Sequence, residues 1–192
     1  MPKQRVLLVP GILGRPSEVF IYRHAMSLKD FDCHVAATEH RNPLTFPHAQ
    51  VHLLDAQAGV PRCLLRMRYA ARFGRRPSRQ AVRSWRLMAV ARQTQAQLLH
   101  VHFLWNAPLA LDAARQFRLP LIVTAHGTDV NSAIVDDAYR ASLQPIFEHA
   151  DLILAVSDFI AQRLVEIGCD EAKVHRHYLG IPIPEKVDSW NE

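Results

Sequence analysis

Short apolar runs recur along the chain and are separated by longer segments in which apolar residues are spaced as in helices. Runs of about four to eight apolar residues bounded by turn signals predict strands buried on both faces of a parallel sheet. The predicted strands are Arg5–Val9, Cys33–Thr38, Val51–Leu54, Leu98–Leu104, Leu121–Ala125, Leu152–Val156 and Lys173–Tyr178. The turn pair Pro10-Gly11 is expected to stop the first of them.

Amphipathic helices are predicted between these strands. They are Ser17–Leu28, Arg62–Phe73, Ser78–Gln95, Pro108–Phe117, Asp136–His149 and Asp158–Ile167. Ser17 and Ser157 are the expected N-caps of the first and last helices, and Pro145 is expected to interrupt the fifth. Strands that alternate with helices indicate βαβ units. The predicted fold is therefore α/β, a single Rossmann-like lobe with a mainly parallel sheet flanked by helices on both faces.

Composition supports one globular unit. A chain of 192 residues with 49% hydrophobic and 21% charged residues fits one domain with a real core, which we place at residues 1–180. Three widely spaced cysteines argue against a disulfide framework and for a reducing compartment. No apolar run reaches the length of a membrane span, and the N-terminus lacks the apolar core of a signal peptide. A cytoplasmic protein is expected.

Basic charge is concentrated in one part of the chain. Residues 56–111 contain ten arginines and no acidic residue. Five of these arginines recur at three- and four-residue spacing and are expected to share a helix face: Arg72, Arg76, Arg79, Arg83 and Arg86. Two interpretations stay open, an ordinary solvated helix face or a surface for anionic lipid or an anionic substrate.

Candidate chemistry lies where the predicted strands end. The strand Leu121–Ala125 runs into His126-Gly127-Thr128-Asp129, and ligands of open α/β sheets bind beyond the carboxyl ends of strands. The alternative is a polar loop whose histidine is satisfied by its neighbours. After the first strand, a loop with Gly14 leads to Ser17 and Glu18 at a helix start, a common anion site. It lacks the Gly-x-Gly-x-x-Gly spacing and the Walker lysine.

A metal site is not expected. His100 and His102 lie on one face of their strand, but a metal would need a third ligand that the spacing does not supply.

Several pieces of the chain, taken in order, resemble the N-terminal lobe of family 4 glycosyltransferases. Ser17-Glu18-Val19-Phe20-Ile21 is similar to the start of helix one in exopolysaccharide members of the colanic-acid type. The other pieces are Leu99–Phe103, Leu119–Asp129, Ala150–Ser157 with Gly168, and Lys173–His175 with Leu179–Ile181. Together they span nearly the whole chain.

The resemblance implies half of a GT-B enzyme, which has two Rossmann lobes and transfers a sugar from a nucleotide-diphosphate donor with retention. It implies that His126 reaches the transferred sugar and stabilises developing positive charge. It places the remaining candidates near the donor diphosphate or sugar: Gly14, Ser17, Glu18, Gly127, Asp129 and Ser157. The nucleotide sugar is a co-substrate, and no metal or other cofactor is expected.

The expected partners follow from the same resemblance. They are a glycan or lipid-linked acceptor, a C-terminal donor lobe in cis or as a partner chain, and an anionic membrane surface at the inner face of the cell membrane. The arginine surface would serve the acceptor or the membrane, and no nucleic acid is expected.

The sequence departs from the family in two places. Gly11 and Gly14 are separated where the family has a glycine pair, and the donor lobe, with its two glutamates eight positions apart, has no counterpart. We therefore expect residues 181–192 to be a tail or the start of an interlobe linker, and the chain to be inactive without the second lobe. It would be an excised domain or one subunit of a split enzyme.

Two other classes remain as alternatives. One is a non-catalytic module that binds a nucleotide or a polyanion. The other is a hydrolase, because Pro10–Gly14 resembles the oxyanion loop of lipases, but the chain has no Gly-x-Ser-x-Gly motif.

Overall fold

The computed structural model describes residues 2–55, 62–74 and 78–180, which contain one seven-stranded sheet. Every strand pair is parallel, and the spatial order is β3-β2-β1-β4-β5-β6-β7. The strands are β1 (Gln4–Leu13), β2 (Phe31–His40), β3 (Val51–Leu53), β4 (Leu98–His102), β5 (Leu121–Ala125), β6 (Leu152–Ala155) and β7 (Val174–Arg176). The predicted α/β fold with a parallel sheet is confirmed. The predicted tail, 181–192, lies outside the described residues.

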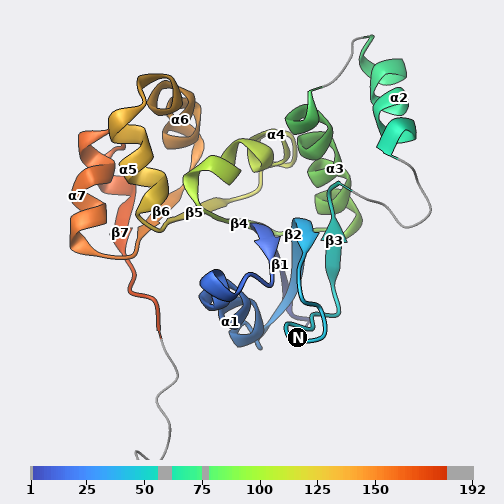
Figure 1. Cartoon of the computed structure of the whole chain (residues 1–192), viewed down its shortest axis with the longest axis horizontal. Coiled ribbons are helices and arrows are strands. Elements are labelled where there is room, and N and C mark those ends of the chain that lie inside the picture. The colour runs from blue at the N-terminus through green and yellow to red at the C-terminus, as the bar shows by residue number, and fades with distance from the viewer. Residues whose placement is uncertain (1, 56–61, 75–77, 181–192) are drawn as a thin grey trace, which may run out of the picture.

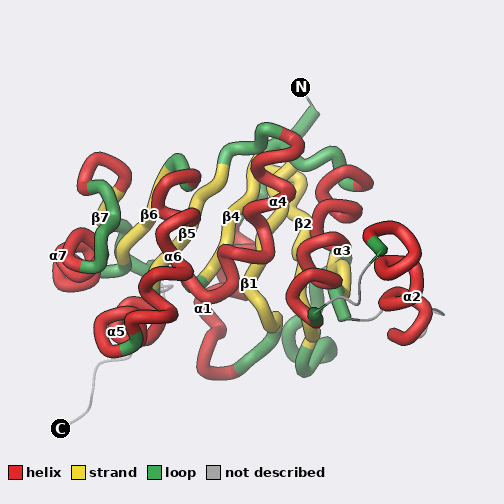
Figure 2. The backbone as a smooth tube through the Cα atoms, turned by 90° about the horizontal axis from the view of Figure 1, so that it is seen from above, coloured by secondary structure: helices red, strands yellow, loops and turns green. Residues whose placement is uncertain are grey.

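The predicted helices connect the strands, and a further helix, α5, was not predicted. They are α1 (Val19–Ser27), α2 (Arg62–Phe73), α3 (Arg79–Gln93), α4 (Ala107–Phe117), α5 (Thr128–Val135), α6 (Asp137–His149) and α7 (Asp158–Glu166). Single 3₁₀ turns lie at Pro16–Glu18, Leu104–Asn106 and Glu171–Lys173. In Figure 1, α1 lies below the sheet and α3 and α4 lie above it. Figure 2 shows α3, α4 and α6 lying over the strands on one face of the sheet.

The two faces of the sheet carry separate cores. Neighbouring residues of β1 point to opposite faces, so Leu7 and Val9 join the core under α3 to α7, whereas Leu8 joins the core under α1. All three side chains are fully buried. A central strand that is covered on both sides reads as a continuous apolar run, which is why the sequence predicted it well.

The α1 face of β4 and β5 carries buried polar side chains. Leu99 and Val101 of β4 pack into the larger core, so His100 and His102 point to the side of α1. Thr124 of β5 lies on the same side, and all three of these polar side chains are buried. The helix that follows β1 therefore covers a group of polar side chains as well as an apolar core.

Two turn signals did not act as predicted. Strand β1 continues through Pro10-Gly11 by means of an irregular register, and Ile12 and Leu13 pair with Glu39 and His40. Gly11 makes this possible because it adopts a φ of +81° and because a Cβ there would lie 2.7 Å from the Asn106 side chain. Helix α6 likewise runs through Pro145. Proline removes one helical hydrogen bond, and the carbonyl that loses it belongs to exposed Ala141.

The segment after β5 is a helix rather than a loop. Helix α5 begins at Thr128, directly after Gly127, so Asp129 stands in its first turn. No helix among the described residues combines the length and apolar character that crossing a membrane requires. The cysteines are free, and Cys33 and Cys169 are buried.

Candidate functional site

The predicted site residues gather at one edge of the sheet. His126 and Gly127 follow β5, Ser157 follows β6 and Gly14 follows β1, and the carboxyl ends of parallel strands meet at the same edge. Gly14 has a φ of +84°, and a Cβ there would lie 2.0 Å from the carbonyl oxygen of Arg41. No side chain fits at this point, because the first loop packs closely against the end of β2.

The first loop differs in detail from the prediction. Ser17 is exposed and does not cap the helix, because a 3₁₀ turn precedes α1, which starts at Val19. Glu18 instead pairs with Arg15 at 2.9 Å. Ser157 does cap its helix, since its Oγ accepts a hydrogen bond from the N–H of Ile160 at 3.2 Å.

Asp129 organises the loops around His126. Its side chain is fully buried, and its Oδ1 accepts hydrogen bonds from the N–H groups of His126 at 3.0 Å and Gly127 at 2.9 Å. Its Oδ2 accepts from the N–H of Leu104 at 2.8 Å. Burial raises the pKa of the Asp129 carboxyl, and the backbone N–H groups oppose that rise. One carboxylate therefore joins the ends of β4 and β5.

The imidazole of His126 is held between aromatic rings. The ring centroids of Phe20 and Phe103 lie 4.8 Å and 4.5 Å from that of His126. Its Nε2 lies 2.9 Å from Nδ1 of His102, and its buried Nδ1 has no partner within the described part of the chain. Burial, reinforced by nearby His24, lowers the pKa of His126 to about 4. The ring is therefore neutral at pH 7.

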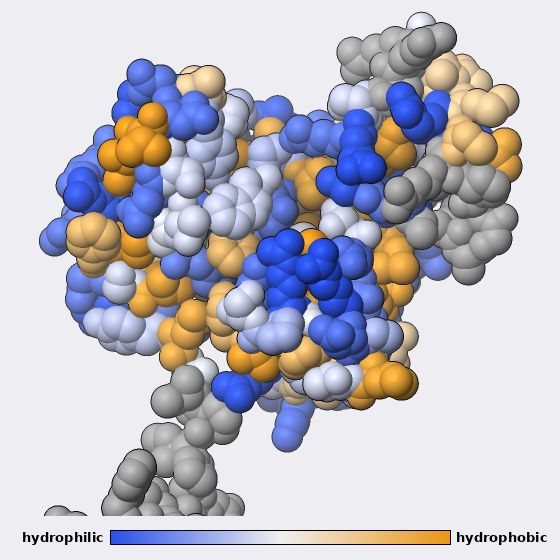
Figure 3. All heavy atoms as spheres, in the orientation of Figure 1, coloured by the Kyte–Doolittle hydropathy of each residue, from blue (hydrophilic) through white to orange (hydrophobic). Residues whose placement is uncertain are grey.

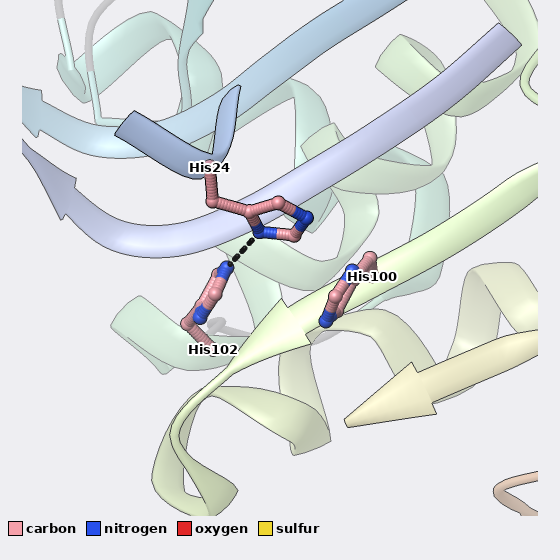
Figure 4. A group of neighbouring side chains, drawn as sticks. All are labelled: His24, His100 and His102. Atoms are coloured by element: carbon pink, nitrogen blue, oxygen red, sulfur yellow. Dashed lines mark hydrogen bonds between the residues drawn. The ribbon is translucent and has the colours of Figure 1, made fainter. Parts of the chain in front are cut away.

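Two further histidines extend this group, and Figure 4 shows them with His102. Nδ1 of His24, on α1, lies 3.1 Å from Nε2 of His102, and Nε2 of His100 lies 2.8 Å from Oγ1 of Thr124. Burial also lowers the pKa of His24, brings that of His100 to about 3 and holds that of His102 well below its ordinary value. Sequence reasoning found the His100–His102 pair and missed His24. A helix that follows β1 and packs on β4 was the available signal.

Two cavities open near these residues. One of about 600 Å³ is lined by His24, His100 and His102 together with apolar side chains of α1 such as Phe20 and Met26. The other, of about 370 Å³, lies between the first loop and the loop after β4. Its walls include Arg15, Glu18, Gln80, Arg83 and Trp105.

The five predicted arginines do not share one helix face. Arg72 belongs to α2, Arg76 lies outside the described residues, and the others belong to α3. Arg83 forms a two-pronged ion pair with Asp55 at 2.6 and 2.5 Å, and Arg86 donates to the carbonyl of Leu54 at 2.9 Å. These two side chains fasten α3 to the end of β3, whereas Arg79 is exposed.

Helix α2 has an exposed face that is both basic and apolar. Leu64 is 44% and Met67 64% exposed, and Arg66 and Arg68 beside them are exposed as well. In Figure 1 this helix stands away from the sheet, and Figure 3 shows apolar side chains at the surface in the same region.

Comparison with known proteins finds one family. The model of Glycosyltransferase Family 4 matches residues 17–183. The glycosyltransferase WcaL of Escherichia coli (strain K12), named for colanic acid biosynthesis, is 31% identical over 97 residues, which are 48% of this chain and 23% of that protein.

Solved structures share the fold. Anabaena HepE, crystallised with UDP-glucose, superposes with a TM-score of 0.68 at 14% identity over 92% of this chain and 44% of its own. A sucrose-phosphate synthase fragment from Thermosynechococcus elongatus gives a TM-score of 0.61 at 16% identity over 92% of this chain and 90% of its own. The chain thus spans less than half the length of HepE and WcaL.

The four buried or half-buried histidines of this group predict a stability that falls in mild acid. The pKa values of His24, His100, His102 and His126 are lowered in the folded state, so the unfolded chain binds more protons below its ordinary histidine pKa of about 6.5. The contribution of these histidines to the free energy of unfolding is fully present above that pH. It is lost as the pH falls toward 4, by up to about 1.4 kcal/mol per pH unit for each such group. Urea unfolding at pH 7.5, 6.5 and 5.5 measures this. His126→Gln should make the stability depend less on pH, whereas His175→Gln, at an exposed site, should leave this dependence unchanged. A wild-type stability that is the same at all three pH values contradicts the lowered histidine pKa values.

Replacing the Asp129 carboxylate should destabilise the fold. Asp129→Asn keeps the shape but places an amide N–H₂ against backbone donors, so we expect a loss of about 1.5–3 kcal/mol in the free energy of unfolding. Exposed Asp30→Asn is the matched control and should change stability by less than about 0.5 kcal/mol. Equal stability of the two variants in chemical denaturation would show that the three hydrogen bonds contribute little.

Proposed function

The chain belongs to Glycosyltransferase Family 4, and on that premise we propose that it is the acceptor-side lobe of a retaining sugar transferase. The full enzyme would move a sugar from a nucleotide-diphosphate donor to a glycan or lipid-linked acceptor. The donor nucleotide would be held by a second lobe, in cis or on a partner chain. The lobe by itself would be inactive or nearly so.

The neutral, fixed His126 carries this proposal. Its backbone N–H is bonded to Asp129 and its Nε2 faces His102, so the buried Nδ1 is the ring nitrogen left for a sugar hydroxyl, which would reach it once a covering side chain moves aside. A polar group that is fixed before the reaction stabilises developing charge without reorganising during it. The neutral ring also adds no positive charge beside an anomeric carbon that becomes positive in the transition state.

The donor diphosphate would approach the carboxyl edge at the first loop. Gly14 lets the backbone come close there, exposed Ser17 offers a hydroxyl, and the positive end of the α1 dipole favours a phosphate. Glu18 would orient Arg15, and Gly127 and Ser157 would line the opposite side of the same edge. No residue of this arrangement requires a metal for the transfer step, and the nucleotide sugar is the co-substrate.

The cavity of about 370 Å³ beside the first loop is the proposed acceptor subsite. Trp105 is 42% exposed there and presents an aromatic face on which a sugar ring can stack. Arg15 and Arg83 supply cationic hydrogen-bond donors, and Gln80 supplies an amide. This combination suits a glycan and would also tolerate the diphosphate of a lipid-linked acceptor.

A membrane contact would be made by α2 rather than by a single arginine stripe. Leu64 and Met67 would enter the headgroup region, and Arg66 and Arg68 would attract anionic lipids by about 1 kcal/mol each. This contact would place the protein at the inner face of the membrane, where lipid-linked acceptors are found.

Loss of His126 should slow the transfer itself. In the two-lobe enzyme, or in this chain mixed with its partner lobe, His126→Ala should lower kcat by about 100-fold, because a fixed polar group is lost at the reacting sugar. The assay is transfer from a panel of nucleotide sugars, with His175→Ala as the control. Turnover by His126→Ala at the wild-type rate would contradict the proposed role of His126. An absence of turnover by the paired wild-type lobes would favour a non-catalytic binding module.

Negative charge introduced at the exposed apolar positions of α2 should release the protein from membranes. Leu64→Glu with Met67→Glu should abolish sedimentation with anionic vesicles at low salt, whereas Val135→Glu, at an 84% exposed apolar site on α5, should not. Equal binding of wild type to neutral and anionic vesicles, or no binding at all, would refute the membrane contact.

A further inference from the structure

Three imidazoles meet between α1 and β4. His24 comes from the helix, and His100 and His102 come from alternate positions of the strand. One ring nitrogen of each lies within 4.8 Å of one ring nitrogen of each of the others. In Figure 4, the ring of His24 reaches down from α1 toward His102, and the rings of His100 and His102 both lie beside β4.

The spacing of these nitrogens is close to that of a metal site. Zinc bonds of about 2.0–2.1 Å in a tetrahedral arrangement place two ligand nitrogens roughly 3.4 Å apart. His24 Nδ1 and His102 Nε2 are already 3.1 Å apart. No separation within the three-nitrogen set exceeds 4.8 Å, so none has to shorten by more than about 1.4 Å, the difference between 4.8 Å and 3.4 Å. A small rotation of side chains therefore completes a three-nitrogen set.

Outer contacts hold two of the rings. Nδ1 of His102 faces Nε2 of His126 at 2.9 Å, which leaves Nε2 of His102 for the cluster. The contact of His100 Nε2 with Thr124 Oγ1 at 2.8 Å fixes the plane of the second ring. Metal-binding histidines are characteristically oriented by a hydrogen bond of the other ring nitrogen.

The chemical state of the rings suits a cation. Burial keeps the pKa values of all three histidines below their ordinary value, so the rings are neutral at pH 7 and a proton does not compete for their lone pairs. Neutral imidazoles bind Zn²⁺, Co²⁺, Ni²⁺ and Cu²⁺, whereas Mg²⁺ and Ca²⁺ prefer oxygen.

The cluster has room and access. His24, His100 and His102 all line the cavity of about 600 Å³, so a cation can enter and keep an open position for water. His177 lines the same cavity and is exposed, so it can approach as a fourth ligand.

We propose that His24, His100 and His102 form a binding site for one borderline divalent cation, with Zn²⁺ as the physiological class. The cation would fasten α1 to β4. The proposal does not rest on the function proposed above, because binding can be measured on this chain alone.

Zinc titration of the purified chain tests the site. Calorimetry with a competing chelator should give one Zn²⁺ per chain, and Co²⁺ should produce the visible absorption of a four-coordinate complex. His24→Gln and His100→Gln should each weaken Zn²⁺ binding by at least about tenfold and remove the Co²⁺ spectrum. Saturating Zn²⁺ should raise the melting temperature of the wild type and not that of the variants.

A matched control is available in the chain. His34 and His52 face each other with Nδ1 and Nε2 at 3.1 Å, the same separation as in His24 and His102, but among the described residues no third ligand completes a compact set with them. His34→Gln should leave Zn²⁺ affinity and stoichiometry unchanged. Loss of binding in His34→Gln with retention in His24→Gln would overturn the proposal, as would the absence of stoichiometric binding to the wild type. If His100→Gln does not fold, as judged by circular dichroism, the partly exposed His24 decides the question.

Discussion

Burial of the central strands on both faces is the constraint on which the rest of this structure depends. Strands β1, β4 and β5 leave no face open to water along most of their length, so helices must pack on each side of them. Polar groups that act on ligands are then confined to the carboxyl ends of the strands. The exception is the α1 side of β4 and β5, where the same burial removes His100, His102 and Thr124 from solvent. The candidate site and the histidine cluster are thus two results of one packing arrangement.

The strands were predictable because a strand buried on both sides consists of consecutive apolar residues. The errors lie where one element depends on another that is distant in sequence. The passage of β1 through Pro10-Gly11 depends on β2 and Asn106, and the start of α5 depends on a buried carboxylate. The arginines of α3 looked like a solvated or lipid-binding face because their contacts with Leu54 and Asp55 lie about 30 residues away.

The same distinction between local and distant contacts applies to the residues of the candidate site. His126, Gly127 and Asp129 are adjacent in sequence, so their grouping could be inferred from the end of one strand. The approach of His24 to His102 spans 78 residues and follows only from the packing of α1 on β4. Local pattern therefore found the residue proposed to meet the sugar, and the tertiary structure supplied the residues that surround it.

The contacts from His24 through His102 to His126 have a further consequence. A neutral imidazole has one donor and one acceptor nitrogen, so the two hydrogen bonds must run in the same direction. If His24 donates, His126 Nδ1 carries a hydrogen. If His24 accepts, His126 Nδ1 presents a lone pair. The tautomers of the three histidines therefore change together, between two states. A molecule that fixes the proton of His24 in its cavity also decides whether Nδ1 of His126 is a donor or an acceptor at the edge of the sheet.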